Sequence, residues 1–301
     1  MKKGDASLFH LEKFMDVVII NGMEISIVTP VYNAAEYLPQ AIESVKRQGF
    51  DDYEWIVCDD GSTDGSAQLL ADAASANPHI RVLSQPNSGV SKARSTCLEK
   101  VSGQYLMFLD ADDALADDCL QILYNQMESQ SADLCIYGWY IHKNDQLYSY
   151  FFEKRETESS AEDRYQMILT DPFLCGGGYP WNKIWRVSAI ENNGQIPQFR
   201  EDLNHYEDKL WTLQRLDAMK NPRVIYYNEP LYHYYMRMES LSHSMSADGF
   251  MQLAEDTMDS LDAITEYVHD NHPGAAATAI TLRNSKLQEI VSTLREAGIT
   301  V

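Results

Sequence analysis

Short apolar runs alternate with helical patterns along residues 25–137, and this alternation restricts the fold more than any other feature of the chain. The apolar runs lie at 25–28, 55–58, 80–83, 105–109 and 134–137. The helical patterns lie between them, at 38–49, 66–75, 90–101 and 117–129. Strands that alternate with helices form βαβ units. The sequence therefore predicts an α/β fold whose mostly parallel sheet is covered by helices on both faces.

The regular alternation ends near residue 140. Residues 143–165 are polar and lack periodicity, which predicts a loop or a short helix. A glycine hinge followed by aromatic residues spans 175–185. A helix near 206–217 and a strand at 224–227 are predicted after it.

The C-terminal pattern is helical from about residue 246, with a rough apolar stripe of Leu253, Met258, Leu261 and Ile264. We expect this stripe to pack on the preceding domain or on a partner subunit, so a homo-oligomer formed through these helices is one expectation. A helix lying on a membrane surface is the disfavoured alternative, because the polar face is not rich in lysine and arginine.

The net charge of −21 in 301 residues bounds the class of partner. A strongly acidic chain offers no basic surface for nucleic acid, so a nucleic-acid partner is not expected. Purely electrostatic docking on anionic lipid is disfavoured for the same reason. An anionic substrate would need a metal ion or local basic residues to offset this field.

The five cysteines are scattered and show no CxxC spacing, which favours buried free thiols in a reducing compartment. No apolar run approaches the length of a membrane span, and the first residues lack the apolar core of a signal peptide. We therefore expect a cytoplasmic protein.

Polar, turn-forming motifs follow four of the apolar runs. They are TPVYN (29–33), DDGSTDGS (59–66), QPNSGVSKAR (85–94) and DADD (110–113). Ligands of open α/β sheets bind beyond the carboxyl ends of the strands, so the chemistry is expected at these motifs.

The DDGSTDGS motif contains more acid than a turn requires. Ser62, Thr63 and Asp64 are good helix-capping residues, which is the structural explanation. Capping does not account for the adjacent Asp59 and Asp60, whose carboxylates could instead accept hydrogen bonds from a ribose or a base. The sequence leaves both interpretations open.

The DADD motif offers hard oxygen ligands at the end of a buried strand. Asp110 and Asp112 can approach one divalent cation while phosphate and water complete its coordination. For an isolated DxD the more frequent alternative is a solvated loop, with Asp113 starting the next helix.

Two further motifs carry groups suited to chemistry. Helix-entry groups that suit a diphosphate are supplied by Asn87, Gly89, Lys92 and Arg94, although a surface turn with ordinary charges is an equal alternative. Glu207 and Asp208 begin a helix, and spacing alone favours stabilisation of the helix dipole over the alternative, a general base that faces the cleft.

Taken together, ISIVTPVYNAAEYLPQAIESVKRQ, YEWIVCDDGSTDGS, NSGVSKAR, YLMFLDADD and YEDKLW resemble the inverting GT-A glycosyltransferases of family 2. Within that family they are similar to the WcaA-like sugar transferases of cell-surface polysaccharide assembly. The resemblance covers 24–137 strongly and 138–243 more loosely. It implies a GT-A domain at 24–243 with nucleotide-sugar and acceptor halves, between an N-terminal extension (1–23) and a C-terminal helical region (244–301).

The resemblance implies a role for each matching residue. Nucleotide-sugar binding falls on Pro30, Val31, Tyr32, Asp59, Asp60, Asn87, Gly89, Arg94, Asp110 and Ala111, with either Asp59 or Asp60 on the base or ribose. Asp110 and Asp112 form the DxD element, with Asp112 the direct ligand of Mn²⁺ or Mg²⁺. Asp208 is the catalytic base, supported by Glu207. Trp181 and Lys183 fall in the acceptor half, and His233 and Arg237 near the diphosphate.

The implied activity is transfer of a sugar from a nucleotide-diphosphate sugar, with UDP the favoured nucleotide, to a hydroxyl of a glycan or lipid-linked acceptor. The QxxRW motif of processive synthases is absent, which indicates a non-processive enzyme. Ser95 stands where the family often has asparagine. Work on such an acceptor would place the protein at the inner face of the cell membrane.

Two other functions are weighed against this one. A nucleotidyltransferase would carry glycine and basic residues after its first strand, and TPVYNAAEYL has neither. A catalytically inactive sugar-nucleotide-binding or scaffold protein is disfavoured because Asp110, Asp112 and Asp208 are all present.

Overall fold

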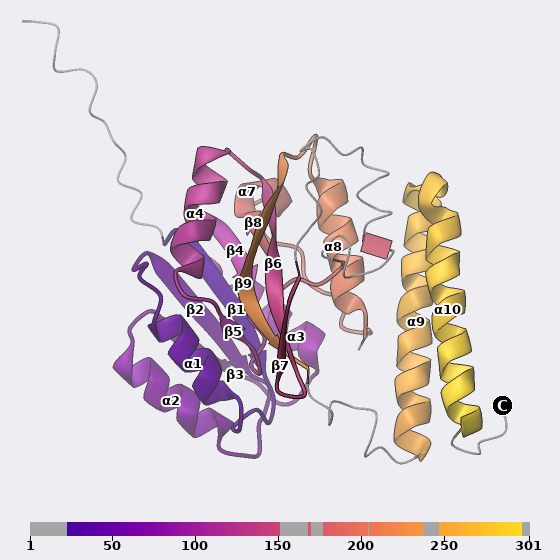
Figure 1. The fold of residues 1–301 in the computed structure, drawn as a ribbon, viewed down its shortest axis with the longest axis horizontal. Helices are drawn as coiled ribbons and strands as arrows, with labels where there is room; N and C mark the ends of the chain where they lie inside the picture. The colour runs from indigo at the N-terminus through magenta and orange to yellow at the C-terminus, as the bar shows by residue number, and fades with distance from the viewer. Residues whose placement is uncertain (1–22, 151–167, 170–176, 204, 237–246, 297–301) are drawn as a thin grey trace, which may run out of the picture.

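The computed structural model describes residues 23–150, 168–169, 177–203, 205–236 and 247–296. Its centre is a nine-stranded sheet with the strand order β3-β2-β1-β4-β8-β6-β9-β5, and β7 pairs with β6 outside this path. Helices α1, α2 and α4 lie on one side of the sheet, and α3 and α8 lie on the other (Figure 1). The predicted α/β architecture, with helices on both faces, is confirmed.

The N-terminal part of the sheet is parallel throughout, because each connection is a helical crossover. Its strands are β1 (Ile25–Val31), β2 (Tyr53–Asp59), β3 (Ile80–Ser84) and β4 (Tyr105–Phe108), and its helices are α1 (Leu38–Lys46), α2 (Ser66–Ala76) and α3 (Val90–Leu98). β1 pairs with both β2 and β4, and β2 pairs with β3. The central strands are covered on both faces, and every residue of β4 is buried.

The second part of the sheet is mixed. It contains β5 (Ala114–Leu115), β6 (Leu134–Lys143), β7 (Gln146–Tyr150), β8 (Lys183–Arg186) and β9 (Val224–Tyr235), with helices α4 (Cys119–Ser129), α7 (Val187–Ile190) and α8 (Glu207–Ala218). β8 runs antiparallel between β4 and β6, and β9 is parallel to β6. β5 pairs antiparallel with the far edge of β9, which brings the DADD loop to that strand.

One sequence prediction is wrong in this part. Residues 146–150, predicted to be loop or short helix, form β7, while the remainder of 143–165 beyond residue 150 lies outside the described residues. Asn144 and Asp145 have positive φ angles of 50° and 60°, which is the geometry of a two-residue hairpin turn. Most of β7 is exposed at the edge of the sheet, so its polar composition concealed the strand.

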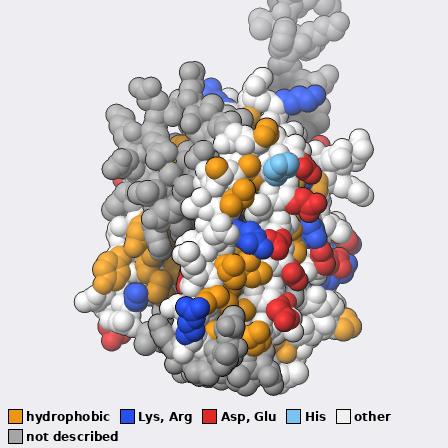
Figure 2. Space-filling model, turned by 90° about the vertical axis from the view of Figure 1, so that its right-hand side faces the viewer, with side chains coloured by type: hydrophobic (Ala, Val, Ile, Leu, Met, Phe, Trp, Pro, Cys, Tyr) orange, Lys and Arg blue, Asp and Glu red, His pale blue; other side chains and the backbone are white. Residues whose placement is uncertain are grey.

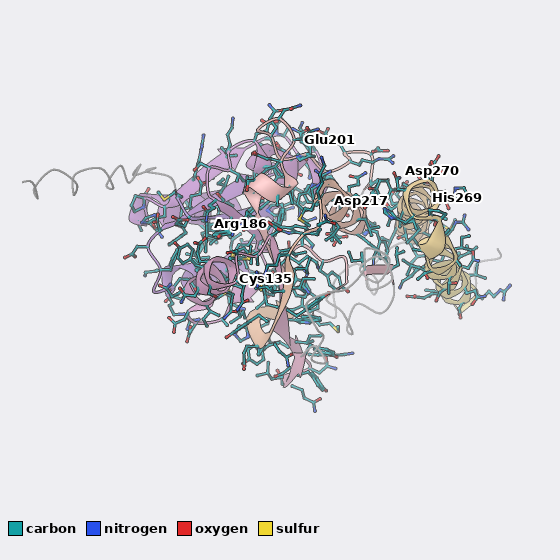
Figure 3. All side chains as sticks on the ribbon, turned by 90° about the horizontal axis from the view of Figure 1, so that it is seen from above. Cys135, Arg186, Glu201, Asp217, His269 and Asp270 are labelled. Atoms are coloured by element: carbon teal, nitrogen blue, oxygen red, sulfur yellow. The ribbon has the colours of Figure 1, made fainter. Side chains whose placement is uncertain are left out.

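The C-terminal helices form an antiparallel pair that packs beside α8 (Figure 1). They are α9 (Ala247–Asn271) and α10 (Ala276–Glu296), joined by a short 3₁₀ turn, Pro273–Ala275. Asp217 on α8 faces this pair (Figure 3), and its Oδ1 lies 2.8 Å from Nε2 of His272. Leu261 and Ile264 of the predicted apolar stripe are buried in the same core cluster as the preceding domain, and α9 contacts α8 as well as α10, so packing on that domain is confirmed for these two residues.

The outer face of the α9 and α10 pair carries hydrophobic side chains among acidic and basic ones (Figure 2). Met251, Ile280 and Leu287 are each about two fifths exposed. Among the residues that the structure describes, no helix has the length and apolar character needed to cross a bilayer. Of the five cysteines, Cys58, Cys97, Cys119 and Cys135 are buried free thiols as predicted, and Cys175 lies outside the described residues.

Candidate active site

The loops after β1 and β2 are bound to each other at the carboxyl edge of the sheet. The Asn33 N–H donates to Ser62 Oγ at 3.0 Å, and the Thr63 N–H donates to Asn33 Oδ1 at 2.8 Å. The Ala35 N–H donates to Asp64 Oδ2 at 3.0 Å, and the Ser66 N–H at the start of α2 donates to Asp64 Oδ1 at 2.8 Å, so Asp64 ties the two loops together. The DDGSTDGS motif therefore builds the rim beside Tyr32, whose side chain is 52% exposed.

Asp60 has its carboxylate occupied by the protein itself. Its Oδ1 accepts hydrogen bonds from Gln85 Nε2 at 2.7 Å and the Ser88 N–H at 2.9 Å. Its Oδ2 accepts from the Gly89 N–H at 2.9 Å. These bonds fix the turn that leads into α3. They give Asp60 a structural task that the sequence did not indicate.

Asp59 is less engaged than its neighbour. Its Oδ1 accepts a hydrogen bond from the Ser62 N–H, at 3.1 Å. Asn87 is exposed, and Gly89 starts α3 with a φ of 90°. Pro30, Val31 and Tyr32 form the end of β1 and its continuation, so all the predicted nucleotide-side residues lie along one edge.

Gly61 is a site-building residue that the sequence analysis missed. Its φ is +74°, and a Cβ atom at this position would lie 2.7 Å from the backbone nitrogen of Asn87. Only glycine permits both this φ and this close approach. The glycine of the DDG triplet was the available signal, because a glycine directly after a strand end marks a backbone that must turn sharply.

Arg94 joins the two acidic motifs that lie far apart in the sequence. Its Nη1 donates to Glu207 Oε1 at 2.6 Å, and its Nη2 donates to Asp110 Oδ1 at 3.2 Å. The Arg94 side chain is 7% exposed, and its guanidinium lies 5.6 Å from the centre of the Phe199 ring. The two carboxylates hold the pKa of Arg94 above its ordinary value despite burial. This cation connects the end of β4 to the start of α8.

Glu207 and Asp208 are brought to this point by the first turn of α8. Burial and the charge of Asp208 raise the pKa of Glu207 to about 7, against the lowering effect of Arg94. Burial also raises the pKa of Asp208, whose Oδ1 accepts from the Lys209 N–H at 2.7 Å. The structure thus places Asp208, the predicted general base, and its neighbour Glu207 close to Asp110.

Hydrogen bonds between the DADD loop and β9 hold the loop in place. The Asp110 N–H donates to the Tyr232 hydroxyl oxygen at 3.1 Å, and that hydroxyl donates to Asp113 Oδ2 at 2.8 Å. Asp113 Oδ1 accepts from the Tyr235 N–H at 2.9 Å. Asp113 is buried and does not start a helix, because α4 begins later, at Cys119. Tyr232 and Tyr235 are not among the residues to which the family resemblance assigns a role.

The donor set at this edge fits a divalent cation that is completed by substrate. Asp110 is 25% exposed in its side chain and Asp112 is half-buried, so both remain within reach of a ligand beyond the sheet. Over the described part of the chain no three acidic, histidine or cysteine side chains group as a complete metal site. Two carboxylates with phosphate and water are a usual arrangement for Mg²⁺, so the residues present suit such an ion.

The two residues predicted for the acceptor half, Trp181 and Lys183, are both buried. Trp181 is buried and stacks on Tyr232 with ring centres 4.8 Å apart. Lys183 is fully buried, and its Nζ donates to the Gly177 and Tyr179 carbonyls and to Asn182 Oδ1. Burial lowers the Lys183 pKa well below its ordinary value.

His233 is not beside the predicted diphosphate position. Adjacent residues of a strand point to opposite faces, and Tyr232 is the one that points to Asp110 and Asp113. His233 instead contacts His142, with Nδ1 2.9 Å from Nε2. Arg237 lies outside the described residues.

Comparison with known proteins gives consistent results. GlyA of Streptococcus pneumoniae, named a glycosyltransferase, is 29% identical over 73% of this chain, which spans only 31% of GlyA. The cholesterol galactosyltransferase of Borreliella burgdorferi is 27% identical over 81% of this chain and 68% of its own length.

Solved structures show the same fold. TarS of S. aureus (residues 1–349 with UDP-GlcNAc) superposes with a TM-score of 0.68 and 21% identity, over 88% of this chain and 72% of TarS. A mannosyltransferase of Pyrobaculum calidifontis with GDP-Man and Mn²⁺ gives 0.53 and 15% identity, over 91% and 79%. The expected GT-A fold is therefore confirmed. Residues 26–194, more than half of the chain, match Glycosyl transferase family 2, and the protein belongs to that family.

Proposed function

We propose that this protein is a non-processive inverting glycosyltransferase that moves a sugar from a nucleotide-diphosphate sugar to a hydroxyl of a glycan or lipid-linked acceptor in surface polysaccharide synthesis. The observation that carries the proposal is the bridge from Asp110 through Arg94 to Glu207, which brings the DxD loop to the helix that bears Asp208. The family match and the glycosyltransferases among its relatives support it.

Asp208 is the proposed general base. It accepts the proton of the acceptor hydroxyl, whose oxygen attacks C1 of the donor sugar while the bond from C1 to the diphosphate oxygen breaks. Attack from the face opposite the leaving group inverts the anomeric centre, so no protein nucleophile is required. Burial raises the pKa of Asp208, which strengthens it as a base near neutral pH. Glu207 is the weaker candidate because Arg94 binds its Oε1.

Asp112 and Asp110 are the proposed ligands of Mn²⁺ or Mg²⁺, whose chemistry is to neutralise the charge that develops on a departing diphosphate. Arg94 keeps Asp110 in place, since its Nη2 binds one of the two carboxylate oxygens. Tyr232 holds the backbone of the same loop.

The nucleotide is proposed to lie on the edge formed by Pro30, Val31, Tyr32 and Asp59. The exposed ring of Tyr32 is suited to pack on a base, and Asp59 is the favoured partner of the ribose or base because Asp60 is occupied. UDP is the favoured nucleotide, and the UDP-GlcNAc in the TarS structure supports this choice. The GDP-Man of the mannosyltransferase structure makes GDP the first alternative.

Self-association, contact with the membrane and the position of the acceptor site are also proposed. The exposed Met251, Ile280 and Leu287 support self-association through α9 and α10 or contact with the inner face of the membrane. In the acceptor half, Trp181 is a candidate for shaping the acceptor site through the rings packed on it, and the full burial of Lys183 favours a structural task.

The function is tested in two stages. A thermal-shift screen of UDP, GDP, CDP and ADP with Mn²⁺ identifies the nucleotide, because stabilisation grows with the ratio of ligand concentration to dissociation constant. The sugars of that nucleotide are then tested for slow release of the diphosphate. Wild-type release that is lost in Asp112→Asn and Asp208→Asn supports the enzyme. Binding with no turnover of any sugar nucleotide, with or without acceptor, would contradict it.

A further inference from the structure

A hollow of about 670 Å³ lies on the opposite face of β9 from the candidate active site. Its lining residues come from the end of α1, from the segment between β5 and α4, from α4, and from strands β6, β7 and β9. β9 contributes Tyr227, Glu229, Pro230, Leu231 and His233 to its lining, and the pairing of β9 with β6 shifts register between Tyr227 and Pro230. Tyr232, between Leu231 and His233, points the other way to Asp113. No step of the proposed transfer reaction uses this hollow.

Aromatic rings form one wall of the hollow. Tyr140 stacks on His233 with ring centres 4.7 Å apart and planes 16° from parallel. Tyr227 lies nearer the start of β9 and is half-buried. The hydrogen bond between His233 and His142 fixes the His233 ring, and burial and His142 lower the His233 pKa to about 4, so this ring is neutral near pH 7. The wall is therefore aromatic and uncharged.

Charged groups of both signs line the remainder of the hollow. Arg47 Nη2 lies 3.7 Å from Asp117 Oδ1, and both side chains are more than half exposed. Glu229 adds a second exposed carboxylate. One guanidinium against two carboxylates disfavours an anionic ligand such as a nucleotide. Hydrogen-bonding groups around an aromatic wall equally disfavour a wholly apolar ligand.

We propose that this hollow is an accessory binding site for a neutral saccharide. The apolar C–H face of a sugar ring packs on aromatic side chains, and its hydroxyls both donate to carboxylates and accept from a guanidinium. The volume is within the usual range of ligand sites, roughly 300–1,000 Å³. This goes beyond the proposed function, because a sugar bound here lies across β9 from Asp110 and undergoes no transfer. The site holds a glycan at a distance from the reacting end.

Binding is tested by saturation-transfer NMR and titration calorimetry with chitotetraose, cellotetraose and maltotetraose, using the full chain. We expect at least one of these to bind the wild type, and Tyr140→Ala to weaken that binding at least tenfold. Tyr148→Ala is the matched control. Tyr148 is exposed on the same β6–β7 hairpin, but it pairs with Ile141 and so lies on the opposite face from Tyr140. Asp112→Asn and saturating UDP are the controls for the catalytic edge.

The result that would overturn the proposal is the absence of binding by all three oligosaccharides, or binding that Tyr148→Ala, Asp112→Asn or UDP reduces as much as Tyr140→Ala does. If Tyr140→Ala does not fold, the double variant Asp117→Asn, Glu229→Gln removes two exposed carboxylates and is expected to weaken binding by a similar factor. Release of nucleotide from the sugar donor is measured in parallel. We expect it to be unchanged in Tyr140→Ala, and its absence from the wild type would contradict only the transferase function.

Discussion

Nη1 of Arg94 lies 2.6 Å from Oε1 of Glu207, although the two residues are 113 positions apart in the sequence. The same guanidinium reaches Asp110, so one buried cation holds the DxD loop and the base-bearing helix in a fixed relation. A motif that the sequence suggested for nucleotide binding therefore has a positioning role as well.

Replacing Arg94 by methionine is expected to reduce both stability and activity. The change leaves Glu207 and Asp110 without their partner, and breaking a buried ion pair costs about 3–5 kcal/mol. Urea denaturation measures the free energy of unfolding, and nucleotide release measures turnover. Lys92→Met is the control, because Lys92 lies on the same helix with an exposed ion pair to Glu201, a class that contributes only about 0–1 kcal/mol. Equal effects of the two changes would contradict the positioning role.

Glu207 is expected to make stability depend on pH. Its pKa of about 7 in the folded protein is above the ordinary carboxyl value, so the folded state binds its proton more tightly than the unfolded state does. This contribution is fully present below the unfolded pKa, about 4.3, and falls as the pH rises to about 7. Unfolding free energies measured at intervals from pH 5 to pH 8 should therefore decrease over this window. Glu207→Gln should show a smaller decrease, and an unchanged slope in that variant would assign the effect to another group.

Asp112 and Asp113 are expected to differ sharply although they are adjacent. Asp112→Asn should abolish Mn²⁺-dependent nucleotide release while the unfolding free energy stays nearly constant, because this half-buried carboxylate is a proposed ligand. Asp113→Ala should cost about 1–3 kcal/mol, since it leaves the Tyr232 hydroxyl and the Tyr235 N–H without their acceptor. Chemical denaturation and nucleotide release on both variants make the comparison. A stable Asp113→Ala protein would show that these bonds matter little.

Gly61→Ala is expected to destabilise the turn between the nucleotide-side loops. A methyl group there meets the backbone of Asn87 at 2.7 Å and is also forced to a φ of +74°. Gly194→Ala isolates the second effect, because Gly194 has a φ of +77° and nothing within 4 Å of the added carbon. Strain of this kind costs about 1–3 kcal/mol, so Gly61→Ala should exceed the control and also weaken nucleotide binding. Thermal denaturation and nucleotide titration of both variants decide this, and equal losses would mean that the contact with Asn87 is relieved at little cost.

Local patterns in the sequence determined the fold class and the edge of the sheet that bears the site. Short apolar runs and helical patterns predict the βαβ units, because both patterns reflect which side chains are buried. Polar residues after the buried strands mark their carboxyl ends. The prediction failed for β7, whose residues are mostly exposed and so carry no apolar signal. It also did not anticipate β8, which the pattern at 175–185 described only as a hinge and aromatics.

The tertiary structure decided which of the predicted residues are available to a ligand. It showed that Asp60 is occupied by the turn before α3, that Lys183 is buried, and that His233 lies across β9 from Asp110. It also brought Arg94 to Glu207 and Tyr232 to Asp113. A motif at the end of a strand shows which residue types are available for a site, but not which hydrogen bonds they make. Which carboxylate keeps a lone pair for substrate depends on hydrogen bonds between segments that only the folded chain brings together.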